Sequence, residues 1–148
     1  MDIVSHGFNI YHDFVINASL QDVFAAVSKP EHLNNWWTLK CTGTPEIDAE
    51  YNLYFAPEYN WYGKVVTCQP NHAFYIKMTK TDDKDWKPTT FGFNLEEIEN
   101  GVQVRFFHIN WPECNHHFRH SSFCWALLLN GLKDYLEKGI VIPFEERA

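Results

Sequence analysis

The chain of 148 residues is long enough for one domain with a buried core, and we expect residues 1–148 to form a single domain. Its 12 basic and 19 acidic residues give a net charge of −7. Because such a chain is poorly suited to a phosphate backbone, nucleic acid is not an expected partner. Aromatic residues make up 17% of the sequence, and they are favoured both in cores and in recognition surfaces.

The sequence shows no membrane or secretion signal. Its longest apolar run, 123–129, is too short to cross a bilayer, so we expect no membrane partner. The first residues, Met1-Asp2-Ile3-Val4, carry no basic region and lead into no apolar segment, unlike a secretory signal. We therefore expect a cytoplasmic protein whose cysteines, which lack CxxC spacing, stay reduced. These cysteines are Cys41, Cys68, Cys114 and Cys124.

The N-terminal part of the chain predicts one strand and two short helices. Residues 8–16 alternate between apolar and polar side chains as a strand does. Ser19 is a typical N-cap for the helix that follows. A second short helix is predicted to begin at Pro30, where proline is tolerated, and to end at Trp36-Trp37. Two short helices between a first strand and the rest of a sheet form a distinctive arrangement.

The middle of the chain, residues 39–79, alternates between strand-like runs and turns. Its connections are short, which favours antiparallel neighbours. Residues 81–88, with three aspartates and two lysines, are expected to form a solvated loop. The strand-like runs are 51–55, 61–68 and 73–79.

The C-terminal part predicts a hairpin followed by a long helix. Two runs of period two, 90–95 and 102–108, are joined across 99–101, whose Asn-Gly pair tolerates the positive φ of a tight turn. An amphipathic helix then begins near Pro112 and stops at Gly139. The order of strand, two helices, further antiparallel strands and one long helix predicts an α+β fold.

The apolar face of the long helix suggests a cavity. Ser121 and Ser122 fall beside Trp125, where a fully packed core would place larger apolar residues. Small hydroxyl-bearing side chains that face a sheet are one way to build a pocket with a few polar contacts. The alternative is that Ser121 bonds back to a carbonyl oxygen one turn earlier.

Several segments occur in a familiar order along almost the whole chain. They are the strand end, cap and Val-Phe pair of 15–24, the Pro-Glu-His-Leu and Trp-Trp of 29–37, Gly63-Lys64-Val65-Val66 with Pro70, the strand 101–108, and the helix from Trp125 to Gly139. Together they resemble the START-like (SRPBCC) superfamily, and within it the homologues of the C-terminal domain of the heat-shock protein 90 ATPase activator. The resemblance implies a helix-grip fold, in which a curved antiparallel β-sheet, two short helices and one long C-terminal helix enclose a cavity.

This fold favours non-enzymatic binding of a hydrophobic or aromatic small molecule between the sheet and the last helix. We expect His108 and Ser121 to orient the ligand through hydrogen bonds, and Trp36 to close one end of the cavity. No cofactor is expected. The apolar walls are expected from Phe55, Trp61, Phe91, Phe93, Phe106 and Trp125.

Two other functions stay open. The resemblance also implies a protein-interaction module related to chaperone ATPase activation. Independently of it, the acidic and aromatic stretch 44–62 suggests a surface for a protein partner or a homodimer, with Tyr54 and Tyr62 as exposed candidate contacts. The resemblance further implies a polyketide-cyclase-like enzyme that uses His108 as general base. The sequence identifies no carboxylate or nucleophile to assist such a base, so a core histidine bonded to a backbone carbonyl is the alternative interpretation of His108.

Three histidines at the start of the long helix raise the question of a metal site. His116 and His120 are four residues apart on one helix face, with Glu113 nearby. That face is polar, a zinc site would need a further ligand from elsewhere, and the glutamate of the metalloprotease helix motif is absent. We therefore interpret His116, His117 and His120 as a solvated patch, and we expect no metal.

Overall fold

The computed structural model describes residues 7–148, so the expectation for Met1-Asp2-Ile3-Val4 concerns residues outside the described part. The described elements alternate strands with a few helices, in the order that the sequence predicts. They are β1 (Phe8–Ile16), α1 (Leu20–Ser28), α2 (Pro30–Leu33), β2 (Lys40–Thr42), β3 (Glu50–Ala56), β4 (Tyr59–Gln69), β5 (Ala73–Lys80), β6 (Thr90–Ile98), β7 (Gly101–Trp111), α3 (His116–Lys138) and the 3-10 helix η1 (Phe144–Glu146).

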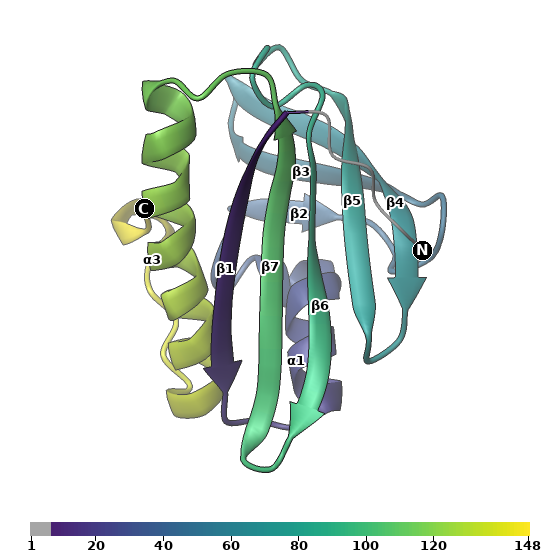
Figure 1. The fold of residues 1–148 in the computed structure, drawn as a ribbon, viewed down its shortest axis with the longest axis vertical. Helices are drawn as coiled ribbons and strands as arrows, with labels where there is room; N and C mark the ends of the chain where they lie inside the picture. Colours follow the sequence, from purple (N-terminus) through teal and green to yellow (C-terminus); the bar gives the residue numbers. More distant parts are fainter. Residues whose placement is uncertain (1–6) are drawn as a thin grey trace.

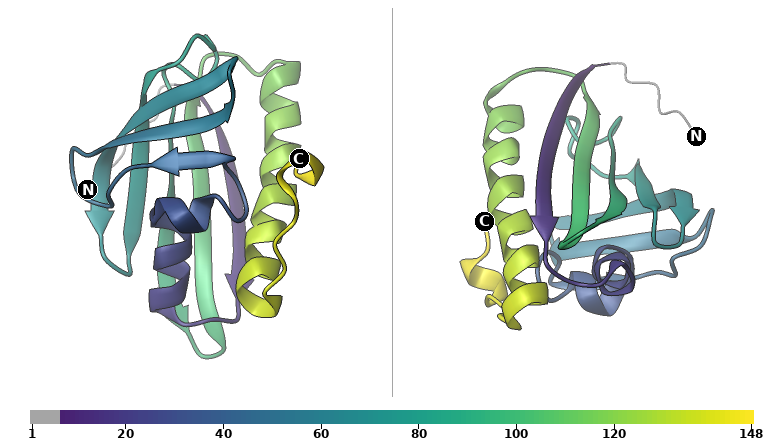
Figure 2. Two further views of the ribbon diagram at one scale, coloured as in Figure 1. Left: turned by 180° about the vertical axis from the view of Figure 1, so that it is seen from behind. Right: turned by 60° about the horizontal axis from the view of Figure 1, so that its bottom comes forward.

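The strands form a 7-stranded sheet in the order β1-β7-β6-β5-β4-β3-β2, in which all neighbours are antiparallel. The sheet is strongly curved, and α1 and α2 lie in its hollow (Figures 1 and 2). Helix α3 runs alongside β1 and also contacts α1 (Figure 1). The α+β helix-grip fold expected from the sequence is therefore confirmed.

Local signals place the ends of several elements as predicted. Strand β1 has the predicted bounds, and the Ser19 hydroxyl accepts a hydrogen bond from the Asp22 amide at 3.1 Å. Helix α3 begins later than Pro112, because the side chain of Asn115 caps it by accepting from the Phe118 amide at 2.9 Å. It ends where Gly139 takes a left-handed φ of 69°.

Two local predictions are wrong. Helix α2 ends at Leu33 rather than at Trp36-Trp37, because the amides of Trp37 and Thr38 both turn back to the Leu33 carbonyl, at 2.8 and 3.1 Å. The segment 81–88 is not fully solvated, since Trp86 keeps only 7% of its surface exposed. Its indole ring contacts the rings of Trp61, His108, Trp111 and Trp125.

Two further expectations concern the cysteines and membranes. All four cysteines are free, which agrees with their isolated positions in the sequence. Among residues 7–148, none of the helices combines the length and apolarity needed to cross a bilayer.

Two glycines should respond to alanine in opposite directions. Gly101 has a φ of 141°, and a Cβ there would lie 2.3 Å from the Ile16 carbonyl oxygen, so we expect Gly101→Ala to destabilise the fold by roughly 1–3 kcal/mol. Gly131 lies inside α3, where the nearest atom to an added Cβ is 3.7 Å away. Gly131→Ala should therefore stabilise by about 1 kcal/mol. Urea unfolding measures both, and equal shifts would contradict this account.

Candidate functional site

The space between α3 and the sheet is filled by Trp125. Its ring centroid lies 4.5 Å from that of Phe106 on β7 and 5.0 Å from that of Trp37. The ring of Phe91 on β6 packs against it as well. Six of the nine expected site residues are buried around this point and line neither of the two cavities described below: Phe91, Phe93, Phe106, His108, Ser121 and Trp125.

His108 is the polar centre of this packing. The indole Nε1 of Trp125 donates to His108 Nδ1 at 3.0 Å, so the neutral ring carries its proton on Nε2. That nitrogen then donates to Thr89 Oγ1 at 2.9 Å, and the Thr89 hydroxyl donates to the Trp86 carbonyl at 2.6 Å. His108 is thus a core histidine, although its partners are side chains rather than a backbone carbonyl.

The environment of His108 disfavours its charged form. Burial, and to a smaller extent the positive charge of His117, lowers the pKa of His108 to about 3. The ring is fully buried and both nitrogens already have partners, so it offers no lone pair to a substrate. In this arrangement His108 orients Trp125 and Trp86 instead.

The low pKa of His108 makes a prediction about stability. In the unfolded chain the imidazole of His108 binds a proton near pH 6.5, whereas in the folded chain it does so only near pH 3. The free energy of unfolding should therefore decrease by about 1.4 kcal/mol per pH unit as the pH falls through that window. His108→Gln keeps one donor and one acceptor without titrating, and should show a shallower loss. Urea unfolding from pH 7 to pH 4 tests this; equal slopes in both proteins would contradict it.

A cavity of about 390 Å³ lies at the edge of the packed core, and we call it the aromatic cavity. Two expected site residues, Phe55 and Trp61, belong to its wall, and their ring centroids are 5.6 Å apart. The C-terminal segment around η1 forms another part of the wall. The full lining is Trp37, Phe55, Tyr59, Trp61, Trp86, Leu128, Phe144, Glu145, Arg147 and Ala148.

A second, smaller hollow of about 260 Å³, which we call the helix groove, lies between α3 and the C-terminal segment. Trp36, expected to close one end of a central cavity, contributes to this groove, while its Nε1 donates to the Ala26 carbonyl at 2.9 Å. Leu128, Arg147 and Ala148 line both hollows. The remaining lining residues of the groove are Asn35, Leu127, Asn130, Gly131, Ile142 and Glu146.

The aromatic cavity contains few polar groups. Trp61 lines it and is buried, and its Nε1 has no hydrogen-bond partner among the described residues. Arg147 is held in place because its Nε donates to the Ile142 carbonyl at 2.9 Å and its Nη1 to the Thr38 carbonyl at 3.2 Å. Arg147 therefore supplies a fixed positive charge to this wall, whereas the unpaired N–H of Trp61 is buried beneath it.

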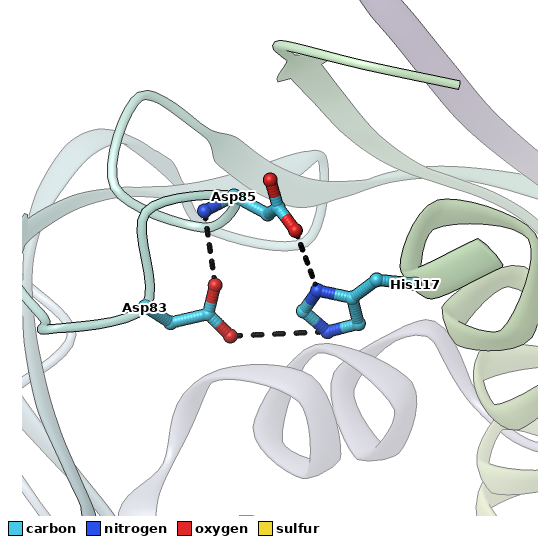
Figure 3. Close-up of side chains that lie close together, drawn as sticks. All are labelled: Asp83, Asp85 and His117. Atoms are coloured by element: carbon cyan, nitrogen blue, oxygen red, sulfur yellow. Dashed lines mark hydrogen bonds and ion pairs between the residues drawn. The ribbon is translucent and has the colours of Figure 1, made fainter. Parts of the chain in front are cut away.

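A polar cluster of two carboxylates and one imidazole connects the loop before β6 to the first turn of α3 (Figure 3). His117 Nδ1 donates to Asp85 Oδ2 at 2.9 Å, and this hydrogen bond lowers the pKa of Asp85. The other ring nitrogen, His117 Nε2, lies 3.8 Å from Asp83 Oδ2. The expected solvated patch holds for His116 and His120, which are exposed, but not for His117.

The sequence interpretation missed Trp37, Trp86 and the Asp85–His117 pair. Trp86 stands among charged residues in a segment without strand or helix periodicity, so no pattern marks it as buried. A lone tryptophan in a polar loop is nevertheless a usable signal, because so large an apolar surface seldom stays in water.

Residues 17–137 match the family described as Activator of Hsp90 ATPase homolog 1-like protein. An Aha1 dimer from Colwellia psychrerythraea is 31% identical in sequence, with a TM-score of 0.81 over 89% of this chain and 98% of that one. Protein SSP2350 from Staphylococcus saprophyticus shares the fold at 18% identity and a TM-score of 0.78, over 95% and 98% of the two chains. Protein BH1534 from Bacillus halodurans also shares the fold, at 19% identity and a TM-score of 0.75, over 90% of this chain and 100% of that one.

No curated protein sequence matches the chain. The family match spans most of the chain, and the relative from Colwellia psychrerythraea is similar over nearly the same length. Both agree with the resemblance seen in the sequence. The chain therefore belongs to the family of Activator of Hsp90 ATPase homolog 1-like proteins.

Proposed function

We propose that the protein binds a hydrophobic or aromatic small molecule in the aromatic cavity, without chemical conversion. The observation that carries this proposal is a hollow of about 390 Å³ walled mainly by aromatic rings. This volume is within the usual range for small-molecule sites, which are mostly apolar with a few polar groups. Rings that already pack edge to face, such as Trp37 and Phe55, offer flat surfaces for a further ring.

A polar contact would orient the ligand at one point of the wall, the guanidinium of Arg147. The N–H of Trp61 has no partner among the described residues, but that atom is itself buried and is not exposed to a ligand in the cavity. The guanidinium of Arg147, which also lines the helix groove, would favour a ligand with an electron-rich or anionic edge.

The geometry supports binding better than catalysis. A polyketide-cyclase-like mechanism would require His108 to accept a proton from a substrate. His108 is fully buried, and its two nitrogens are bonded to Trp125 and Thr89. It also does not line the aromatic cavity.

Native mass spectrometry of the protein purified from its own host tests the proposal directly. We expect a stoichiometric small-molecule adduct that disappears on denaturation. As a second readout, 1-anilinonaphthalene-8-sulfonate, an aromatic anion, should bind and quench the fluorescence of the cavity tryptophans. Absence of both an adduct and saturable dye binding would contradict the proposal.

Two neighbouring leucines provide a matched pair of variants for the same assay. Leu128 lines the aromatic cavity, whereas Leu127 lines only the helix groove and is 49% exposed. Leu128→Phe should partly fill the cavity and weaken dye binding at least tenfold, while Leu127→Phe should leave it unchanged. Circular dichroism checks that both proteins remain folded. Equal weakening in the two variants would place the dye in the groove instead.

A protein-interaction role is the second candidate, in the form of a homodimer. The relative from Colwellia psychrerythraea is a dimer. In this chain, Phe123 and Leu127 lie one turn apart on α3 with 63% and 49% of their surfaces exposed, and Ile140 and Val141 are exposed just beyond the helix. Adjacent exposed apolar side chains of this size are typical of an interaction surface.

Light scattering after size exclusion tests the dimer. We expect a mass near twice 17.5 kDa for the wild type and a monomer for the Phe123→Glu/Leu127→Glu variant, because two buried carboxylates would oppose association. Tyr54→Glu/Tyr62→Glu is the control that should stay dimeric, because these two strand residues are half-buried rather than exposed as the sequence predicts. A monomeric wild type at high protein concentration would exclude this candidate.

A further inference from the structure

We propose that residues 141–148 form a strap that opens to admit a ligand to the aromatic cavity and closes over it, with the hydrogen bond from Arg147 to the Thr38 carbonyl as its latch. The inference rests on the proposed binding function of that cavity, and it adds the route by which a ligand enters. After α3 the chain turns back and runs alongside the helix (Figure 2). The strap lies beyond residues 17–137, so the family match by itself says nothing about it.

The strap forms a large part of the walls of both hollows. Four of the ten residues that line the aromatic cavity belong to it, and so do four of the ten that line the helix groove. Elsewhere the wall of the aromatic cavity includes Trp37, Trp61 and Trp86, which are buried in the hydrophobic core. A way in past these rings would disturb the close packing of the core, whereas displacement of the strap would not.

Few contacts hold the strap against the rest of the molecule. None of its residues is buried, and none of its apolar side chains belongs to the hydrophobic core. Its backbone hydrogen bonds stay within the strap: the amide of Glu146 donates to the Pro143 carbonyl at 2.9 Å, and that of Arg147 to the Phe144 carbonyl at 3.1 Å. Segments with so few buried contacts open locally at a much lower free-energy cost than a core does.

One hydrogen bond fastens the strap to the body of the protein. Among the described residues, the bond from Arg147 Nη1 to the Thr38 carbonyl, at 3.2 Å, is the only hydrogen bond or ion pair that joins 141–148 to the rest. Thr38 is fully buried, so its carbonyl is a fixed acceptor. On the strap itself, Arg147 Nε donates to the Ile142 carbonyl at 2.9 Å, and the guanidinium lies 5.7 Å from the ring centroid of Phe144. Loss of the bond to Thr38 would therefore release the guanidinium and the Phe144 side of the wall together.

The hinge lies where α3 ends. Gly139 has a φ of 69°, and its amide donates to the Tyr135 carbonyl at 3.1 Å, which caps the helix independently of the strap. A Cβ at Gly139 would meet no atom within 4 Å, and Ile140 and Val141 are exposed, so the chain just beyond the helix has room to turn. A few residues at the end of an element are where closing motions usually take up their change in φ and ψ.

Stopped-flow kinetics with an uncharged aromatic probe test the latch. N-phenyl-1-naphthylamine carries no charge, so its binding does not depend on attraction to the guanidinium. Arg147→Gln, whose shorter side chain loses the bond to Thr38, should raise both the association and the dissociation rate constants by roughly fivefold or more. Both constants rise because a strap that opens more often passes the probe in both directions. A rise in the dissociation rate constant alone, or no change in either constant, would overturn the proposal.

Arg119→Gln is the matched control. Arg119 is exposed on α3 and lines neither hollow, and its Nη1 donates to the Cys114 carbonyl at 3.1 Å, so both substitutions remove the same kind of bond. The Arg119→Gln protein should bind the probe with the rate constants of the wild type. Equal acceleration in the two variants would be a general effect of the lost charge and would exclude the latch. Circular dichroism checks that both proteins remain folded.

A measurement on the free protein separates the strap from the proposed binding function. In ¹⁵N relaxation dispersion, the amides of residues 141–148 should share one exchange process on the microsecond-to-millisecond timescale. The population of the open state should increase in Arg147→Gln, and it should stay as in the wild type in Arg119→Gln. If no probe binds, the proposed function fails and the dispersion alone decides the strap. Flat dispersion in the wild type and in Arg147→Gln would overturn the strap even if the probe binds.

Discussion

The hydrogen bond from Trp125 to His108 organises the centre of the molecule. It joins α3 to β7 within the buried core, and it leaves Nε2 of His108 to donate to Thr89 just before β6. The Thr89 hydroxyl in turn holds the Trp86 carbonyl, so the polar chain extends into the loop before β6. Each member has a partner, which a buried polar network requires if it is to stabilise rather than strain a core.

Because Trp125 fills the space that a helix-grip fold can leave open, the hollow lies to one side. It is bounded by Trp37 from the turn after α2, by Phe55 and Trp61 from β3 and β4, and by the C-terminal segment. Three of the nine expected residues, Trp36, Phe55 and Trp61, line a hollow, while the others support it from the core. The sheet and the helix therefore form the scaffold, and the edge of the sheet forms the pocket.

The loop of residues 81–89 connects these features. Thr89 completes the partners of His108, Trp86 contributes both to the core and to the wall of the aromatic cavity, and Asp83 and Asp85 face His117 on α3. A segment without regular structure thus joins the core, the pocket and the polar cluster. Loops held in this way by a rigid scaffold are where binding groups are often found.

The sequence by itself determined six of the seven strands, all but β2, together with the hairpin turn at Gly101, the Ser19 cap and the buried face of α3, because these depend on period and on neighbours a few residues away. It also identified the inward direction of His108 on β7, since alternation sets the face of a strand residue. Tertiary structure alone decided that Trp125 fills the centre, that Trp86 leaves the solvent, and that Asp85 meets His117. These contacts join residues far apart in the chain, and local periodicity specifies a face but not the distance to whatever packs against it.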